Sequence, residues 1–225
     1  VVYKATDWLR NAYVVPLSAL EQGVPELLVA KGNRTLQEYC WTLGSVFTRE
    51  MLRVLENLYG GKEIVYLDAD NFIMGDVSEV YKKYAKFPVS LMPHHFAEKD
   101  KERLLPNGFY NVNFVMVSRK GVPFLNEWAE LCLAWCYNRN EKGRFGDQKY
   151  LDELSAKYGT VDISEPQIGL APWNNMNYDH SVIDEKLCID GKPVLMYHTH
   201  ESVVDKDGKM LKRTEWKLHP SVEEH

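Results

Sequence analysis

The chain has 225 residues, of which 45% are hydrophobic and 26% charged, a composition typical of a globular enzyme or binding protein. A formal net charge of −5, without any Lys/Arg-rich stretch, argues against a nucleic-acid-binding protein. No apolar run approaches the roughly 20 residues of a membrane span, and no signal peptide is visible, so we expect a cytoplasmic protein with one domain over residues 1–225.

Strands and helices alternate along the first third of the chain. The apolar run Ala12–Leu17 predicts a short strand. Over Thr35–Leu58 the apolar residues recur at helical spacing, and we expect a helix that is broken at Gly44 and stopped at Gly60. Ile64–Leu67 is a continuous β-favouring run, the pattern of a strand buried on both faces.

The same alternation continues to the end of the sequence and sets the fold class. The further predicted elements are a helix over Val77–Tyr84, strands over Pro88–Met92 and Phe109–Ser118, helices over Val122–Tyr137 and Asp147–Tyr158, and a strand over Val194–His200. Interleaved strands and helices indicate an α/β fold with a mixed or mostly parallel sheet flanked by helices.

An acid pair follows the predicted strand Ile64–Leu67. Asp68 and Asp70, separated by Ala69, stand where a buried strand emerges, and ligands of α/β folds usually bind at that edge of the sheet. Mg²⁺ and Mn²⁺ prefer oxygen ligands, often one or two carboxylates together with substrate phosphates. The pattern favours a cation site over the alternative, a pair of solvated acids in a turn.

The last predicted strand carries two histidines, His198 and His200, which point to the same side of an extended chain. A neutral imidazole can complete a metal site begun by carboxylates, and it suits Mn²⁺ better than Ca²⁺. The alternative is a pair of polar residues at a strand end. Together with the acid pair, the pattern favours ligation by one of the two.

Asp147 and Gln148 open a predicted helix, and two interpretations stay open for them. Asp147 stands at a helix N-cap position, where it would stabilise the helix. Alternatively, both side chains bond the hydroxyl groups of a bound sugar.

Several other polar residues have both a structural and a functional interpretation. Asn111 and Asn113 alternate in a predicted strand, where asparagine is uncommon, and they either bond loop backbone or line a pocket. Trp173 and Asn174 follow a proline turn and form either a site wall or core. Weaker candidates for substrate and phosphate contacts are Lys31, Arg34, His94 and His95.

These segments, in this order, resemble glycosyltransferases of the GT-A fold related to family 8, and more closely a set of bacterial nucleotide-diphospho-sugar transferases. The likeness spans nearly the whole chain. The matching segments are residues 31–34, 38–42, 66–70, 93–96, 110–114, 135–137, 145–152, 170–174 and 197–200.

The resemblance implies a metal-dependent enzyme that moves a sugar from a nucleotide-diphospho-sugar, with a UDP-sugar expected, to a glycan, lipid or protein acceptor. By resemblance, Mn²⁺ or Mg²⁺ binds to Asp68, Asp70 and His198, and anomeric configuration is retained. The implied catalytic residues are Asp147 and Gln148, and the implied donor-binding residues are Lys31, Arg34, Asp68, Ala69, Asp70, Asn111, Asn113, Trp173 and Asn174. We expect the sheet to lack the first strand of that fold.

Two other functions compete with this prediction. One is a non-catalytic module that binds a nucleotide sugar or a glycan. The other is a phosphohydrolase of the haloacid dehalogenase type, which also uses Asp-x-Asp after a strand but would leave the His198 strand without a role.

Overall fold

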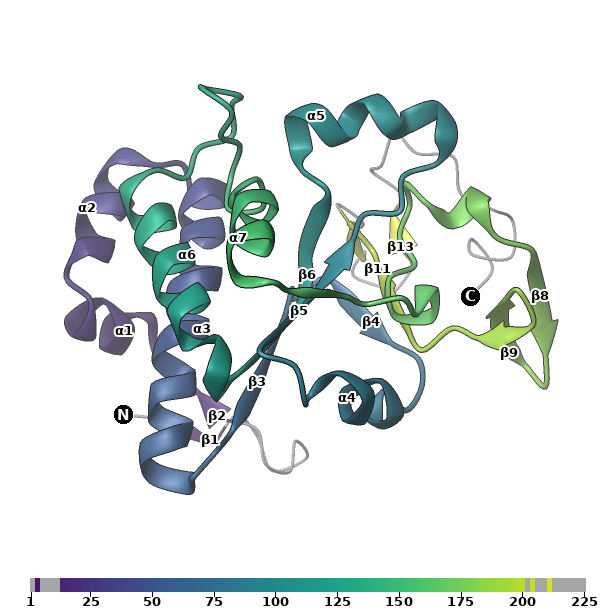
Figure 1. The fold of residues 1–225 in the computed structure, drawn as a ribbon, viewed down its shortest axis with the longest axis horizontal. Helices are drawn as coiled ribbons and strands as arrows, with labels where there is room; N and C mark the ends of the chain where they lie inside the picture. Colours follow the sequence, from purple (N-terminus) through teal and green to yellow (C-terminus); the bar gives the residue numbers. More distant parts are fainter. Residues whose placement is uncertain (1–2, 5–12, 201–202, 205–209, 212–225) are drawn as a thin grey trace.

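The computed structural model describes residues 3–4, 13–200, 203–204 and 210–211, which combine helices with β-sheets (Figure 1). The helices are α1 (Leu17–Gly23), α2 (Glu26–Asn33), α3 (Leu36–Tyr59), α4 (Ser78–Tyr84), α5 (Leu104–Asn107), α6 (Val122–Ala134) and α7 (Tyr150–Tyr158), with 3₁₀ turns η1 (Glu98–Arg103), η2 (Arg119–Gly121), η3 (Pro166–Ile168) and η4 (Asn175–Asn177). The strands are β1 (Tyr3–Lys4), β2 (Tyr13–Val14), β3 (Glu63–Leu67), β4 (Asn71–Ile73), β5 (Val89–Pro93), β6 (Tyr110–Ser118), β7 (Val161–Asp162), β8 (His180–Ile183), β9 (Lys186–Ile189), β10 (Lys192–Pro193), β11 (Met196–His198), β12 (Val203–Val204) and β13 (Met210–Leu211). The α/β class is therefore as predicted.

The central sheet is mixed and has the strand order β3-β6-β5-β7. β6 runs antiparallel to both of its neighbours, and β5 and β7 form the parallel pair. Of the two predicted arrangements, mixed or mostly parallel, the sheet is therefore the mixed one. Alternating strands and helices suggest crossover connections, but the segment with η1 and α5 returns the chain from β5 to the adjacent β6.

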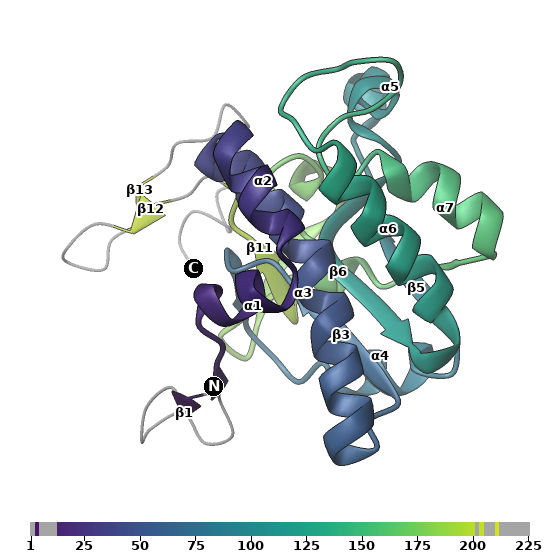
Figure 2. The same cartoon turned by 90° about the vertical axis from the view of Figure 1, so that its left-hand side faces the viewer.

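Helices cover both faces of this sheet, giving three layers (Figures 1 and 2). On one face, side chains such as Leu91 of β5 and Val115 of β6 pack with Trp128 of α6 and Leu151 of α7. On the other face, alternate residues of the same strands, such as Met116, pack against α4 and η3. The period-two alternation of β6 therefore supplies two separate apolar cores.

Helix α3 is continuous, so the predicted break at Gly44 was wrong. Its start is a capping box, in which Thr35 Oγ1 accepts from the Glu38 amide and Glu38 bonds the Thr35 amide in return. Its end is Gly60, whose φ of 64° lies in the left-handed region that favours glycine. At Gly44 a Cβ would stand 3.0 Å from the Tyr66 hydroxyl oxygen, so this glycine allows close packing instead of ending the helix.

Several element ends differ from the predictions. Within the described residues β3 is an edge strand that pairs with β6 alone. It is half-buried, although Ile64 and Tyr66 pack against one core and Val65 against the other. The helix predicted over Val122–Tyr137 ends at Ala134, because Trp135 is extended. Only Tyr13–Val14 of the predicted strand Ala12–Leu17 is extended; residue 12 lies outside the described residues.

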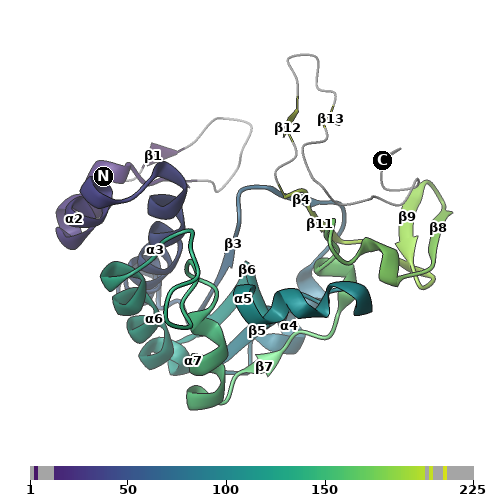
Figure 3. The same cartoon turned by 90° about the horizontal axis from the view of Figure 1, so that it is seen from above.

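Within the described residues four smaller sheets accompany the central one: β1 pairs with β2, β12 pairs with β13, and the other two are seen in Figure 3. β4 pairs antiparallel with β11, and β8, β9 and β10 form a three-stranded antiparallel sheet. Within the described residues, no helix has the length and apolarity that a bilayer crossing requires.

Candidate metal centre

The acid pair lies in the turn that joins β3 to β4. The Asn71 amide donates to the Asp68 carbonyl oxygen over 3.2 Å, which closes the turn. The Asn71 side chain braces it, donating from Nδ2 to the Asp68 carbonyl at 3.1 Å and to the Asn113 carbonyl at 3.0 Å. The turn is therefore fixed to β6, and Ala69 at its tip is exposed.

The pairing of β4 with β11 brings the histidines to this turn. His198 is the register partner of Asn71, the residue after Asp70. Thr199 then donates twice to the Asp70 carbonyl oxygen, from its amide at 2.9 Å and from its hydroxyl at 2.7 Å. A single residue, Thr199, thus attaches the histidine strand to the acid turn.

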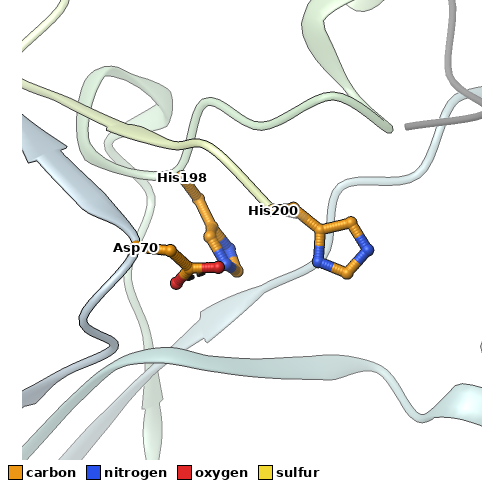
Figure 4. A group of neighbouring side chains, drawn as sticks. All are labelled: Asp70, His198 and His200. Carbon is orange, nitrogen blue, oxygen red and sulfur yellow. Dashed lines mark ion pairs between the residues drawn. The ribbon is translucent and has the colours of Figure 1, made fainter. Parts of the chain in front are cut away.

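Asp70, His198 and His200 form one group, in which a ligand atom of each lies within 4.8 Å of those of the others (Figure 4). Nε2 of His198 is 3.2 Å from Oδ1 of Asp70. His198 is 4% exposed, whereas the Asp70 side chain is 42% exposed, so the group is buried on one side and open on the other. Ligands about 2.1 Å from one cation lie at most about 4.2 Å apart, so a cation requires only a small contraction.

The charges of the group support cation binding. Burial by itself would raise the pKa of Asp70, but the hydrogen bond and the charge of His198 outweigh it and lower that pKa. Asp70 is therefore an ionised carboxylate at neutral pH, next to two imidazole rings. Carboxylate oxygen with imidazole nitrogen is a donor set that suits Mn²⁺, so the residues fit the predicted cation.

Asp68, the other predicted acid ligand, lies outside this group of three. Its Oδ1 accepts a hydrogen bond from the Tyr66 hydroxyl at 2.6 Å. Burial raises the pKa of Asp68, and the charge of Asp70 adds to this, while Tyr66 and His198 act in the opposite direction. Asp68 is therefore near enough to the group to feel its charges, but its carboxylate is bonded to the β3 side.

Trp173 packs against the histidines and supports them. Its ring meets both imidazoles edge to face, with centroids 5.2 Å from His198 and 5.1 Å from His200. The indole orientation is set by Nε1, which donates to the His94 carbonyl oxygen at 2.8 Å. Trp173 thus packs against the histidine side of the Asp70 group.

Asp147 is buried, 6% exposed, in the turn before α7. The prediction that it caps this helix was wrong. The helix begins at Tyr150, and its N-cap is Lys149, which makes no side-chain cap bond. The backbone carbonyl oxygen of Asp147 accepts a hydrogen bond from Trp128 Nε1. Burial, followed by the charge of Asp68, raises the pKa of Asp147 to about 8. The two carboxyl groups are therefore electrostatic neighbours, and Asp147 is largely neutral at pH 7.

Gln148 has a structural contact. Its Nε2 donates to the Asn107 carbonyl oxygen at 2.8 Å. Nearby, Lys149 pairs with Asp152 at 2.8 Å, and Asp152 accepts from the Phe109 amide at 2.8 Å. Gln148 thus helps to attach the segment between β5 and β6 to α7, and the structure records no contact between it and the Asp70 group.

The two asparagines of β6 differ in their contacts. Asn111 Oδ1 accepts from the Asn113 amide at 2.9 Å, and its Nδ2 bonds His94 Nε2 at 3.2 Å. This bond lies where the β5–β6 register shifts, because Met92 pairs with Asn111 although Leu91 pairs with Val115. Asn113 is 1% exposed, and its Oδ1 has no hydrogen-bond partner within the described residues.

The remaining residues predicted to bind the sugar donor form hydrogen bonds or ion pairs with other parts of the fold. Asn174 donates to the His94 and Gly169 carbonyls, at 3.1 and 2.9 Å, and accepts from the Ala171 amide. Arg34 donates to Thr42 and to the carbonyls of Cys132 and Leu133, which closes the end of α6. Lys31 pairs with Glu21 at 2.7 Å. None of these contacts involves the Asp70 group.

Sequence reasoning missed three residues of the site and left one aside. Tyr66, Asn71 and Thr199 organise the group through hydrogen bonds, and His200 joins it although only His198 was preferred. One signal was available for Tyr66, because a tyrosine two residues before Asp68 points to the same side of a strand. Thr199 and Asn71 carry no such signal, because their contacts depend on the β4–β11 pairing.

The chain is similar to two proteins of Bacillus subtilis (strain 168). It is 32% identical to the uncharacterized protein YfnF over 202 residues, which are 84% of this chain and 64% of YfnF. It is 27% identical to the uncharacterized protein YfnD over 204 residues, or 87% of this chain and 64% of YfnD. The chain therefore spans less than two thirds of the length of these curated relatives. No family model matches it.

Proposed function

We propose that the chain is a metal-dependent glycosyltransferase of the GT-A kind, which transfers a sugar from a nucleotide-diphospho-sugar to an acceptor. The observation that carries this proposal is the group of Asp70 and two histidines at the end of β3. A carboxylate at that edge of an α/β sheet, open to solvent on one side, is suited to a cation that also contacts diphosphate oxygens.

Each residue has a part in the proposed reaction. Bound Mn²⁺ supplies the positive charge that a departing nucleoside diphosphate requires. Asp70 and His198 hold the cation, and Trp173 shields the histidines from water. Asp68 faces the donor from the β3 side. Asp147, buried and largely neutral at pH 7, can donate a hydrogen bond to a sugar hydroxyl group.

The proposed donor is a UDP-sugar, and the proposed outcome at the anomeric carbon is retention; both follow from the resemblance to family 8. The test is a thermal-shift screen of UDP-, GDP- and ADP-sugars with and without Mn²⁺, followed by measurement of released nucleotide. A ligand at 100 times its Kd stabilises a protein by about 2.7 kcal/mol, so binding is readily detected.

The outcomes separate the candidate functions. Mn²⁺-dependent stabilisation with release of the nucleoside diphosphate supports the transferase. Stabilisation without turnover, in the presence of broad acceptor mixtures, indicates a binding module. Release of inorganic phosphate from phosphate esters, with no effect of nucleotide sugars, would replace the proposal with a phosphohydrolase.

A further inference from the structure

His200 is the member of the Asp70 group that the proposed function leaves without a role. A nitrogen of its ring lies within 4.8 Å of the ligand atoms of Asp70 and His198. The two imidazole rings are 5.7 Å apart between centroids, at an angle of 81°. The Trp173 ring meets both imidazoles edge to face, so one indole packs against the two histidines.

The backbone at His200 is unusual for a residue with a side chain. β11 ends at His198, and His200 has a φ of 32°, in the left-handed region. Such a conformation persists where surrounding contacts impose it, and it is enriched at ligand sites. Here Thr199 imposes the turn by donating twice to the Asp70 carbonyl, which keeps the His200 ring beside Asp70.

Asp68 is held in a different direction. Its Oδ1 is engaged by the Tyr66 hydroxyl at 2.6 Å, and Tyr66 in turn packs against Gly44 of α3. A larger residue at position 44 would meet this ring, so helix α3 and strand β3 together keep Tyr66, and through it Asp68, in place. The ligand atoms of the group of three do not include Asp68.

We propose that Asp70, His198 and His200 form a two-imidazole, one-carboxylate site for a divalent transition-metal ion, with Asp68 outside the protein ligand set. Two nitrogen ligands favour Mn²⁺, Co²⁺ and Zn²⁺ over Mg²⁺ and Ca²⁺, which take oxygen ligands. The site is therefore selective against Mg²⁺. This inference deepens the proposed function, and rests on it only for the use of the cation, because the ligand set can be tested without any nucleotide.

The test measures binding of Mn²⁺, Co²⁺ and Mg²⁺ to the complete 225-residue chain by titration calorimetry, without nucleotide. Pulsed electron paramagnetic resonance of bound Mn²⁺ detects the coordinating nitrogens. The variants are His200→Gly, which suits the left-handed backbone, His200→Asn, which tolerates it, and Asp68→Asn. His180→Asn is the matched control, because His180 lies on β8 and is not part of the group.

We expect the parent to bind Co²⁺ at least about 100-fold more tightly than Mg²⁺, with two nitrogen couplings on Mn²⁺. Both His200 variants should lose at least about tenfold in Mn²⁺ affinity and one nitrogen coupling, whereas Asp68→Asn and His180→Asn should change the affinity by less than about threefold. Two nitrogen couplings retained in His200→Gly, an Asp68→Asn loss equal to that of His200→Gly, or Mg²⁺ binding as tight as Co²⁺ binding would overturn the proposal. A chain that binds metal as expected but turns over no nucleotide sugar contradicts the proposed function alone.

Discussion

Two sets of polar side chains, both chosen from the sequence as candidate site residues, behave differently in the structure. The bracing residues form hydrogen bonds from their side chains to backbone carbonyls and amides; they are Arg34, Asn111, Gln148 and Asn174. The facing residues influence one another electrostatically at the end of β3, and two of them, Asp70 and His198, are in direct contact; the set is Asp68, Asp70, Asp147 and His198.

The difference shows which polar side chains remain able to bind a ligand. A buried polar group must find partners, and in the bracing residues the fold itself supplies them. Buried charges that face each other instead change their protonation or pair with a counter-charge. The raised pKa of Asp147 and the lowered pKa of Asp70 are both responses of this kind. A ligand that brings positive charge fits the facing residues.

Substitution of Asp70 should have the largest effect. We expect Asp70→Asn to weaken Mn²⁺ binding by at least about 1,000-fold, roughly 4 kcal/mol, because an anionic oxygen ligand is lost. Asp184→Asn, at an exposed position away from the group, serves as the control. Titration calorimetry of both variants decides the question, and an Asp70→Asn chain with parental Mn²⁺ affinity would place the site elsewhere.

Substitution of Arg34 should lower stability and leave metal binding nearly unchanged. We expect Arg34→Ala to lower the free energy of unfolding by about 2–3 kcal/mol, because the carbonyls of Cys132 and Leu133 lose charge-assisted hydrogen bonds. The Mn²⁺ affinity should stay within about twofold of the parent, since the hydrogen bonds of Arg34 to Thr42, Cys132 and Leu133 do not involve the Asp70 group. Chemical denaturation and metal titration of one preparation measure both. Weakened metal binding without loss of stability would move Arg34 to the facing residues.

Asp147 should make stability depend on pH. Its pKa is about 8 when folded, above the ordinary value of 3.8, so the folded chain binds more protons than the unfolded chain between these values. Stability therefore falls as pH rises through this range, by up to about 1.4 kcal/mol per pH unit. Asp147→Asn should flatten this slope in metal-free melting curves from pH 5 to pH 8, and should stabilise the chain most at the alkaline end. An unchanged slope would show that Asp147 is ionised throughout.

Gln148 should have the smallest effect on stability, and its substitution separates a bracing role from a role in the reaction. Loss of its bond to the Asn107 carbonyl in Gln148→Ala should cost about 1 kcal/mol of stability and leave Mn²⁺ affinity unchanged. If Gln148 also makes the contact with the donor sugar that the sequence predicts, through its amide oxygen, turnover should fall by far more than the small loss of stability can explain. Melting temperature and nucleotide release measured together distinguish the two roles.

The sequence predicted local features well and the pairing of distant segments poorly. Helix α3 was predicted within one residue at each end, because its capping box and its terminal glycine are local signals. The acid turn was predicted from the apolar run before it. The antiparallel course of β6 was missed, because strand direction depends on connections that a hydrophobic pattern does not encode.

The same limit applied to the site. Asp70 and His198 could be chosen by residue type, and the structure places them 3.2 Å apart. The engagement of Asp68 by Tyr66, and of Gln148 by Asn107, could not be predicted, because each depends on the packing of separate elements. The N-cap role considered for Asp147 failed because the helix begins later than its sequence pattern suggests: α7 starts at Tyr150, with Lys149 at its N-cap.

The pairing of β4 with β11 has a consequence for the order of events during synthesis. It joins residues 71–73 to residues 196–198, so the ligand set is split across most of the described chain. A nascent chain on the ribosome carries Asp70 long before the histidines have been translated. If the proposed site binds its cation, capture must follow closure of a loop of more than 120 residues, so metal loading would report completed folding instead of promoting its early steps.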